Sequence, residues 1–253
     1  MDSFKIEICA NSVESGIQAE IGGADRIELC ENLAEGGTTP SIGMIQSALE
    51  NLKILVNVIV RPRGGDFCYS DIEFEIMKND IIAIKKLNAN GVVIGILTPE
   101  GNVDIMRCID LVEVAKPMEV VFHRAFDRTQ DPFKALEDII NIGFDRILTS
   151  GLQPTALLGK NLIAEIIAKA GDRISIMPGS GVTEDNIAEI YETSKAKEFH
   201  MSLRKVVDGQ MIYRSNKLKL SSSSEFPEFG TLVTEAARVK KVREILNQFY
   251  NAK

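Results

Sequence analysis

The chain has 253 residues, 45% hydrophobic and 26% charged, which is typical of a folded globular protein and excludes disordered and fibrous classes. Its formal net charge is −7, and no block of Lys and Arg is long enough to follow a nucleic-acid backbone, so nucleic acid is excluded as a partner. The N-terminus lacks a basic start followed by a long apolar stretch, and no apolar run approaches the roughly 18 residues of a membrane span. We therefore expect a cytoplasmic protein without membrane contact.

The cysteines are scattered and form no CxxC pair. They are Cys9, Cys30, Cys68 and Cys108. A domain of this size does not need disulfide bonds for stability, so we expect free thiols that pack as small apolar side chains.

Short apolar runs alternate with longer amphipathic stretches along the chain. The runs predict strands at residues 4–10, 26–30, 54–60, 91–97, 119–123, 146–150, 174–178 and 198–202. The segment after Asp131 illustrates the predicted helices, because Pro132 favours a helix start, Gly143 a helix end, and apolar residues between them recur every three or four positions.

This regular alternation predicts an α/β fold, a parallel (β/α)8 TIM-type barrel formed by residues 1–253 as a single domain. An open doubly wound sheet is the alternative, but it usually has a longer connection where the strand order reverses. We interpret residues 208–230 as a polar loop on the functional face, followed by a C-terminal helix over 231–249.

Polar side chains cluster where the predicted strands end, which is where barrels of this type build their sites. Residues two apart on a strand point to the same side. The polar or ionisable residues at these ends are Glu7, Cys9, Glu28, Cys30, Asn57, Arg61, His123, Thr149, Ser150, His200 and Ser202.

The run "EVVFHRAFD" at 119–127 shows the pattern most clearly, because an apolar strand finishes in His123 and Arg124 and is soon followed by Asp127. Polar and charged side chains are costly to bury, so their presence at the end of an apolar strand is explained if that end faces a shared cavity. Carboxylates, histidines and an anion-binding arginine, Arg61 or Arg63, fit proton transfer beside a carbonyl group. A satisfied structural network with no chemistry is the alternative.

The stretch "MPGSGVTEDN" at 177–186 is a second candidate site. Gly179, Ser180 and Gly181 would let backbone amides approach a phosphate, and a helix starting near Thr183 would direct its positive end towards them. A tight turn between strand and helix also needs glycine, so the turn alone does not decide.

Cys9 and Cys30 occupy equivalent ends of neighbouring predicted strands, which lie roughly 5 Å apart. Two thiolates at this spacing suit a soft ion such as Cu(I). Packing of two small buried thiols is the alternative interpretation.

Seven stretches of the chain, in order up to about residue 203, resemble the CutC family, which is named for copper homeostasis. They are "EICANSVESG", "GGADRIELCENLAEGGTTPS", "VIVRPRGGDFCYS", "GVVIGILTPEGNVD", "FHRAFD", "RILTSG" and "GSGV". The resemblance implies a cytoplasmic βα barrel that self-associates as a homodimer or other homo-oligomer. It also implies that Cys9 and Cys30 match cysteines proposed as Cu(I) ligands in the family.

Two functional hypotheses follow. In the first, the protein serves copper homeostasis and binds Cu(I) through Cys9 and Cys30. In the second, it is an enzyme for a small anionic or phosphorylated metabolite, with Glu28 or Glu7 as base and His123 as its proton partner. Arg61 would hold the anion, residues 179–181 a phosphate, and His200 would also lie in the pocket. An inert barrel with a structural polar end is a third, weaker possibility.

Overall fold

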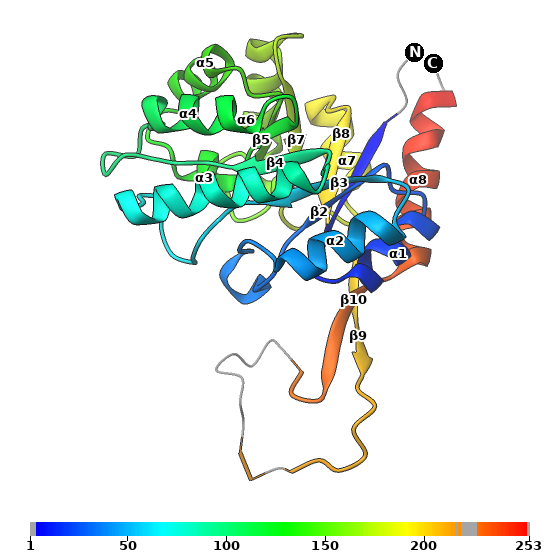
Figure 1. Ribbon diagram of the computed structural model, residues 1–253. Coiled ribbons are helices and arrows are strands. Elements are labelled where there is room, and N and C mark those ends of the chain that lie inside the picture. Colours follow the sequence, from blue (N-terminus) through cyan, green and yellow to red (C-terminus); the bar gives the residue numbers. More distant parts are fainter. Residues whose placement is uncertain (1–3, 216, 219–226, 252–253) are drawn as a thin grey trace.

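The computed structural model describes residues 4–215, 217–218 and 227–251 (Figure 1). The barrel strands are β1 Lys5–Ala10, β2 Arg26–Leu29, β3 Leu55–Ile59, β4 Gly91–Ile94, β5 Glu119–Phe122, β6 Arg146–Thr149, β7 Ser175–Pro178 and β8 Glu198–Met201, and a separate pair is formed by β9 Arg204–Asp208 and β10 Gly230–Thr234. The helices are α1 Val13–Ile21, α2 Ile42–Asn51, α3 Asp71–Lys86, α4 Ile105–Ala115, α5 Pro132–Ile142, α6 Ala156–Ala170, α7 Ile187–Ser194 and α8 Ala236–Asn251, with short 3-10 turns at Leu33–Glu35 and Arg124–Arg128.

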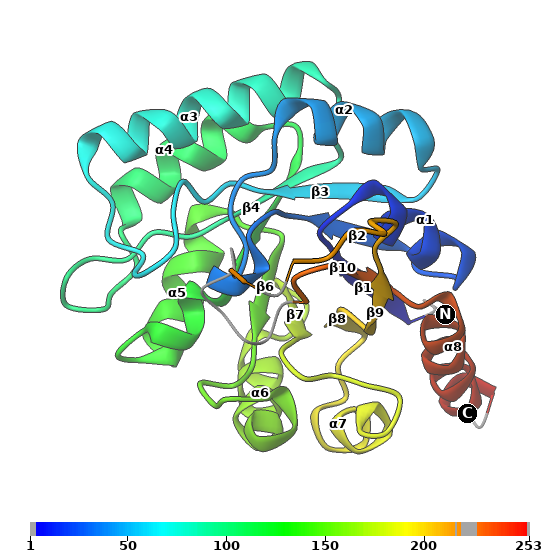
Figure 2. The same cartoon turned by 90° about the horizontal axis from the view of Figure 1, so that it is seen from below.

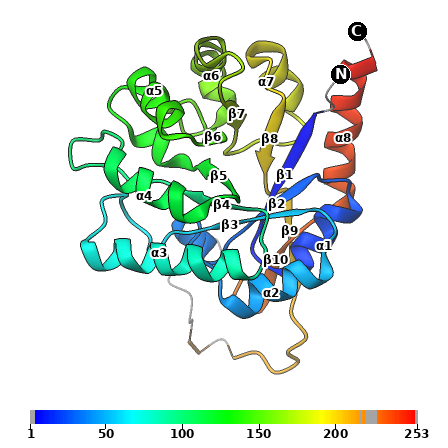
Figure 3. The same cartoon turned by 45° about the horizontal axis from the view of Figure 1, so that its top comes forward.

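The eight parallel strands follow one another around the sheet in chain order, and β8 returns to pair with β1. The helices surround these strands on the outside (Figure 3). A doubly wound sheet would reverse its strand order, so the predicted (β/α)8 barrel is confirmed, with each strand within the range expected for it.

The barrel has one incomplete seam, between β7 and β8. These strands lie side by side, but among the described residues no backbone ladder joins them. Instead, the Ser175 hydroxyl at the start of β7 donates a 2.9 Å hydrogen bond to Glu198 Oε1 at the start of β8. Side chains therefore close the cylinder where backbone bonds do not.

Capping residues determine where the helices begin and end. In α5, Asp131 accepts hydrogen bonds from the Phe133 and Lys134 amides, and Gly143 ends the helix at a left-handed φ of 96°. Both predicted boundary signals are confirmed.

The segment after β8 differs from the expectation of a loop followed by a helix over 231–249. Residues 204–208 and 230–234 form an antiparallel pair, and α8 begins only at Ala236. Three of the four residues from Thr231 to Thr234 are β-branched, which favours a strand once Arg204–Asp208 is available as a partner. In Figure 1 this pair projects from the end of the barrel where the strands finish, and Figure 2 views the molecule from that side.

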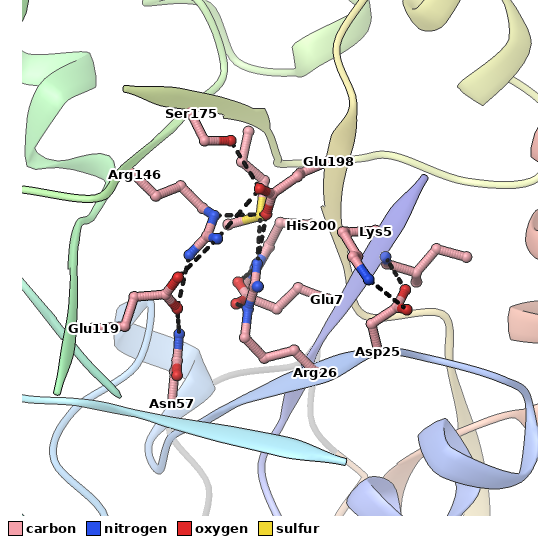
Figure 4. Close-up of polar contacts among 12 residues, drawn as sticks. Lys5, Glu7, Asp25, Arg26, Asn57, Glu119, Arg146, Ser175, Glu198 and His200 are labelled. Carbon is pink, nitrogen blue, oxygen red and sulfur yellow. Dashed lines mark hydrogen bonds and ion pairs between the residues drawn. The ribbon is translucent and has the colours of Figure 1, made fainter. Parts of the chain in front are cut away.

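A layer of buried ion pairs fills the opposite end of the barrel interior (Figure 4). Arg26 and Arg146, the first residues of β2 and β6, are 4% and 5% exposed. Arg26 pairs with Glu7 and, at 2.9 Å, with Glu198. Arg146 donates to Glu198 at 2.6 Å and to Glu119 at 3.0 Å. Glu198 on β8 thus joins β2 and β6, neither of which is its neighbour in the sheet.

Burial opposes ionisation of Glu198, but the Arg146 and Arg26 guanidinium groups outweigh it and hold the pKa of Glu198 below its ordinary value. A buried ion is costly unless it is paired, so each guanidinium group in this layer needs its carboxylate partners to remain buried, and each carboxylate needs its guanidinium partner.

Removal of one guanidinium should therefore destabilise the barrel strongly. We expect Arg146→Met to lower the free energy of unfolding by roughly 3 kcal/mol or more, because Glu198 and Glu119 lose a shared partner inside the barrel. Urea denaturation measures this. The control is Arg173→Met, which removes an exposed pair with Glu137 and should cost far less. Equal losses in the two variants would contradict a special role for the buried layer.

Candidate functional site

A cavity of about 1080 Å³ opens at the ends of the strands, between the loops that follow them. Most of the residues singled out from the sequence line it. They are Cys9, Glu28, Arg61, His123, Ser180, Gly181 and His200. Convergence of strand ends on a shared cavity was the expectation, and this is where these residues lie.

Glu7 lies deeper in the barrel and does not line the cavity. It pairs with Arg26, and its Oε1 lies 2.8 Å from Nδ1 of His200 (Figure 4). Burial works against its ionisation, but Arg26 and His200 outweigh it and hold the pKa of Glu7 well below its usual range. A carboxylate held ionised in this way is a weak base, so the structure favours Glu28 over Glu7 for proton transfer.

Glu28 and His200 face each other at the cavity floor, with Nε2 of His200 3.8 Å from Oε2 of Glu28. Burial raises the pKa of Glu28 to about 7, although His200 partly counteracts the effect. Burial lowers the pKa of His200, but Glu28, Cys9 and Glu7 outweigh it and raise that pKa well above its ordinary value. The pair can therefore hold and exchange a proton near neutral pH.

Cys9 and Cys30 are in contact, with their Sγ atoms 3.6 Å apart. Cys30 is 1% exposed and Cys9 is half-buried at the cavity wall. The hydrogen bond with Cys30, together with burial, raises the pKa of the Cys9 thiol well above its ordinary value. The adjacency expected from neighbouring strands is thus present. In the ladder Cys9 stands opposite Glu28, so Cys30 lies diagonal to Cys9, two residues further along β2's path.

Cys9 also belongs to a second group of possible metal ligands. Its Sγ, a carboxylate oxygen of Glu28 and a ring nitrogen of His200 all lie within 4.8 Å of one another. Because Nδ1 of His200 contacts Glu7, Nε2 is the ring nitrogen left to face this group. Sulfur, nitrogen and oxygen donors therefore converge at one point of the cavity floor.

Arg61 is held mainly by backbone carbonyls. Its Nη1 donates to Glu35 O at 2.6 Å and Gly37 O at 2.8 Å, and its Nη2 donates to Gly65 O at 3.0 Å. Its Nε is buried and has no hydrogen-bond partner among the described residues. The anion-binding fork expected from the sequence is therefore reduced to the donors that remain after these three bonds. Arg63 does not line the cavity and pairs with Glu73.

His123 is buried and neutral. Burial, reinforced by the nearby Arg61 charge, lowers its pKa to about 3. Nδ1 accepts a 3.2 Å hydrogen bond from the Ala125 amide, so the proton of the neutral ring resides on Nε2. Nε2 is buried without a partner among the described residues. His123 thus offers a hydrogen-bond donor and no proton acceptor to the cavity.

The rest of the "HRAFD" run has a structural role. Asp127 accepts bonds from the Thr149 hydroxyl at 2.6 Å and the Ser150 amide at 3.0 Å, which joins the loop after β5 to the end of β6. Arg124 donates to Asp127 at 2.8 Å. Of the three polar residues that end this run, only His123 has a buried side-chain atom without a partner among the described residues.

The glycine turn after β7 has two steric reasons for its composition. A side chain at Gly179 would approach Leu148 within 2.5 Å, and Gly181 has a left-handed φ of 69°. The expectation of a helix starting near Thr183 is wrong, because a turn held by the Thr183 amide and Asn186 Oδ1 precedes α7, which starts at Ile187. Ser180 and Gly181 still line the cavity, whereas Gly179 packs behind it.

The sequence reasoning missed two sets of charged residues. The first is the barrel's buried layer of ion pairs, which strand alternation could have predicted. Arg26 lies two residues before Glu28, and Glu198 two residues before His200, so each points to the same inward side as its later neighbour. The second is a set of cavity arginines, Arg128, Arg204 and Arg238. They belong to loops and to β9 and α8, where no periodicity indicates direction.

This combination defines the class of protein: a (β/α)8 barrel with a polar, small-molecule-sized cavity at the ends of its strands. The chain matches the family model of the CutC family over residues 4–205. It is 46% identical over 244 residues to the human copper homeostasis protein cutC homolog, covering 96% of this chain and 89% of that protein. It is 50% identical over 236 residues to a CutC family protein of Parabacteroides distasonis, covering 93% and 97%.

A solved structure agrees with these matches. The crystal structure of the CutC protein from Streptococcus agalactiae superposes with a TM-score of 0.75 at 35% identity, covering 79% of this chain and 98% of that one. The chain belongs to the CutC family, and the resemblance seen in the sequence is confirmed. None of the described helices is long and apolar enough to cross a membrane.

The electrostatics of the cavity floor give a direct test. We expect the carboxyl group of Glu28 to titrate at about pH 7, because burial disfavours its charged form. Infrared difference spectra should show a protonated-carboxyl band that disappears as the pH rises through this value and that is missing in Glu28→Gln. A band that persists in Glu28→Gln would assign the titration to another group.

Proposed function

We propose that the protein acts in copper homeostasis by binding Cu(I) between Cys9 and Cys30. The observation that carries this proposal is the 3.6 Å contact between the two Sγ atoms at the wall of an open cavity. Relatives that share 46% identity carry the name copper homeostasis protein, which supports the same function.

The donor set fits the ion. Thiolates are soft ligands that favour Cu(I) over hard cations, and the two thiols come from adjacent strands of a rigid barrel. Cys30 is buried while Cys9 lines the cavity, so an ion can enter past Cys9 and be shielded from water beside Cys30.

His200 would supply the nearest further donor to the ion. Its Nε2 faces Cys9 and would lose its proton when the ion binds, while Nδ1 contacts the Glu7 carboxylate. Carboxylates that hold the second nitrogen of a metal-binding histidine fix the orientation of its ring. Arg26 in turn holds Glu7, so the buried ion pairs would support the site from below.

Two finer expectations belong to the same proposal, a cytoplasmic location and self-association. Apolar side chains exposed on and beside β9 support self-association, since exposed apolar clusters often mark protein interfaces. They are Val206, Val207, Met211, Ile212 and Tyr213.

The proposal predicts tight Cu(I) binding that depends on both cysteines. An anaerobic titration of the reduced protein against a competing Cu(I) chelator should show one ion per chain. Cys9→Ser and Cys30→Ser should each weaken the affinity by more than about a hundredfold, because a direct ligand matters more than its supporting residues. Cys68→Ser is the matched control and should bind as the unaltered protein does. Weak binding, or binding unchanged in the Cys9 and Cys30 variants, would contradict the proposal.

The affinity should also depend on pH. The contact with Cys30 and burial raise the pKa of Cys9, so its thiol is protonated at neutral pH and must lose its proton when the ion binds. Cu(I) affinity should therefore rise with pH, by about tenfold per unit for each proton released. The same competition experiment between pH 6 and pH 8 measures the slope. An affinity independent of pH would mean that no thiol is deprotonated on binding.

A further inference from the structure

The cavity is much larger than a copper ion requires. Its volume of about 1080 Å³ matches sites for small metabolites, which occupy roughly 300–1,000 Å³. The proposed Cu(I) ligands take up one part of its floor. The remaining wall carries side chains that are not ligands for Cu(I).

That remaining wall is rich in arginine, although the chain as a whole has a net charge of −7. The cavity arginines are Arg61, Arg124, Arg128, Arg204 and Arg238. Arg124 pairs with Asp127, and Arg238 pairs with Glu184. The other three form no ion pair with any carboxylate of the described residues, and Glu28 and Glu35 are the remaining acidic residues of the lining. The surplus of positive charge favours an anionic ligand.

Three donor atoms of this wall are buried without an acceptor among residues 4–215, 217–218 and 227–251. They are Nε of Arg61, Nε2 of His123 and Nη1 of Arg204. Arg61 and His123 are each 4% exposed. Unsatisfied buried donors are rare and costly, so acceptor oxygens of a ligand would remove a real penalty. Both Arg61 and His123 contact the Phe67 ring, at 5.2 Å and 5.0 Å from its centroid, and so belong to one sector of the cavity.

Arg204 belongs to the opposite sector, after β7 and β8. It follows β8 closely and, like Ser180 and Gly181 after β7, lines the cavity. The Ser180 and Gly181 amides donate to no acceptor in the described part of the chain. In (β/α)8 barrels the loops after the seventh and eighth strands frequently hold a phosphate group. Arg204, with one unpartnered nitrogen, and the two amides line the same cavity, and together they provide suitable donors for a phosphate.

We propose that this cavity binds a small phosphomonoester, with its phosphate against Ser180, Gly181 and Arg204 and an uncharged oxygen at its other end against Arg61 and His123. The ligand spans the cavity between the two sectors and leaves Cys9 and Cys30 free. This site is therefore additional to the proposed Cu(I) site and does not depend on it.

Calorimetry and ³¹P NMR with three probes test the proposal: glycerol 3-phosphate, inorganic phosphate and glycerol. Both phosphates should bind the unaltered protein and glycerol should not. Arg204→Gln should weaken both phosphates by roughly tenfold or more, the effect of losing one charge-assisted hydrogen bond. Arg173→Gln, an arginine outside the cavity, is the matched control and should bind as the unaltered protein does.

The other end of the site has its own variant. His123→Asn retains an acceptor for the Ala125 amide but removes the Nε2 donor. It should weaken glycerol 3-phosphate several-fold and leave inorganic phosphate unchanged, because only the longer ligand reaches this end. Cys9→Ser should bind both phosphates normally, which separates this site from copper.

Three results would overturn the proposal: no binding of glycerol 3-phosphate at about 10 mM, equal binding by Arg204→Gln and the unaltered protein, or equal binding of glycerol. Thermal unfolding checks that each variant is folded. If Arg204→Gln does not fold, Arg204→Lys replaces it, since lysine keeps the positive charge but lacks the Nη1 donor, and a several-fold loss is expected.

Discussion

The contact chain from Arg26 through Glu7 to His200 is the constraint on which the site depends. Inside the barrel a lone carboxylate would be neutral, but the guanidinium keeps Glu7 ionised. Glu7 in turn orients His200, and against the effect of burial Glu28, Cys9 and Glu7 together raise the pKa of its ring. His200 then faces Glu28 and Cys9 with its remaining nitrogen. The properties of the cavity floor are thus set by an ion pair that never touches a ligand.

This arrangement divides the cavity into regions of different chemistry. The floor combines thiols with a carboxyl and an imidazole, whereas the arginine-rich wall carries buried donors that find no acceptor within the described part of the chain. Soft sulfur ligands do not recognise an oxyanion, and guanidinium groups do not bind Cu(I), so the two regions select different partners. Storage of a metal alone gives no use for the two buried nitrogens, Nε of Arg61 and Nε2 of His123, that have no partner among the described residues.

Strand alternation carried most of what could be foreseen from the sequence. Period-two spacing indicates that Glu28 and Cys30 share a side, and strand adjacency brings Cys9 to Cys30. The fate of Arg61 could not be foreseen, because its acceptors are carbonyls of loops whose paths have no periodic signal. The start of α8 was misjudged for a related reason. Thr231–Thr234 becomes a strand only because a partner strand, distant in sequence, lies beside it.

The seam between β7 and β8 makes the barrel a rolled sheet whose two margins meet without backbone bonds. Elsewhere around the circumference, widening the cylinder would break hydrogen bonds of a ladder, but here it would break only side-chain contacts such as that of Ser175 with Glu198. The lowest resistance to expansion therefore lies beneath the loops that carry Ser180 and Arg204. Expansion of the cavity would therefore cost least along this line and most on the cysteine side of the barrel, where β1 is paired with both β2 and β8.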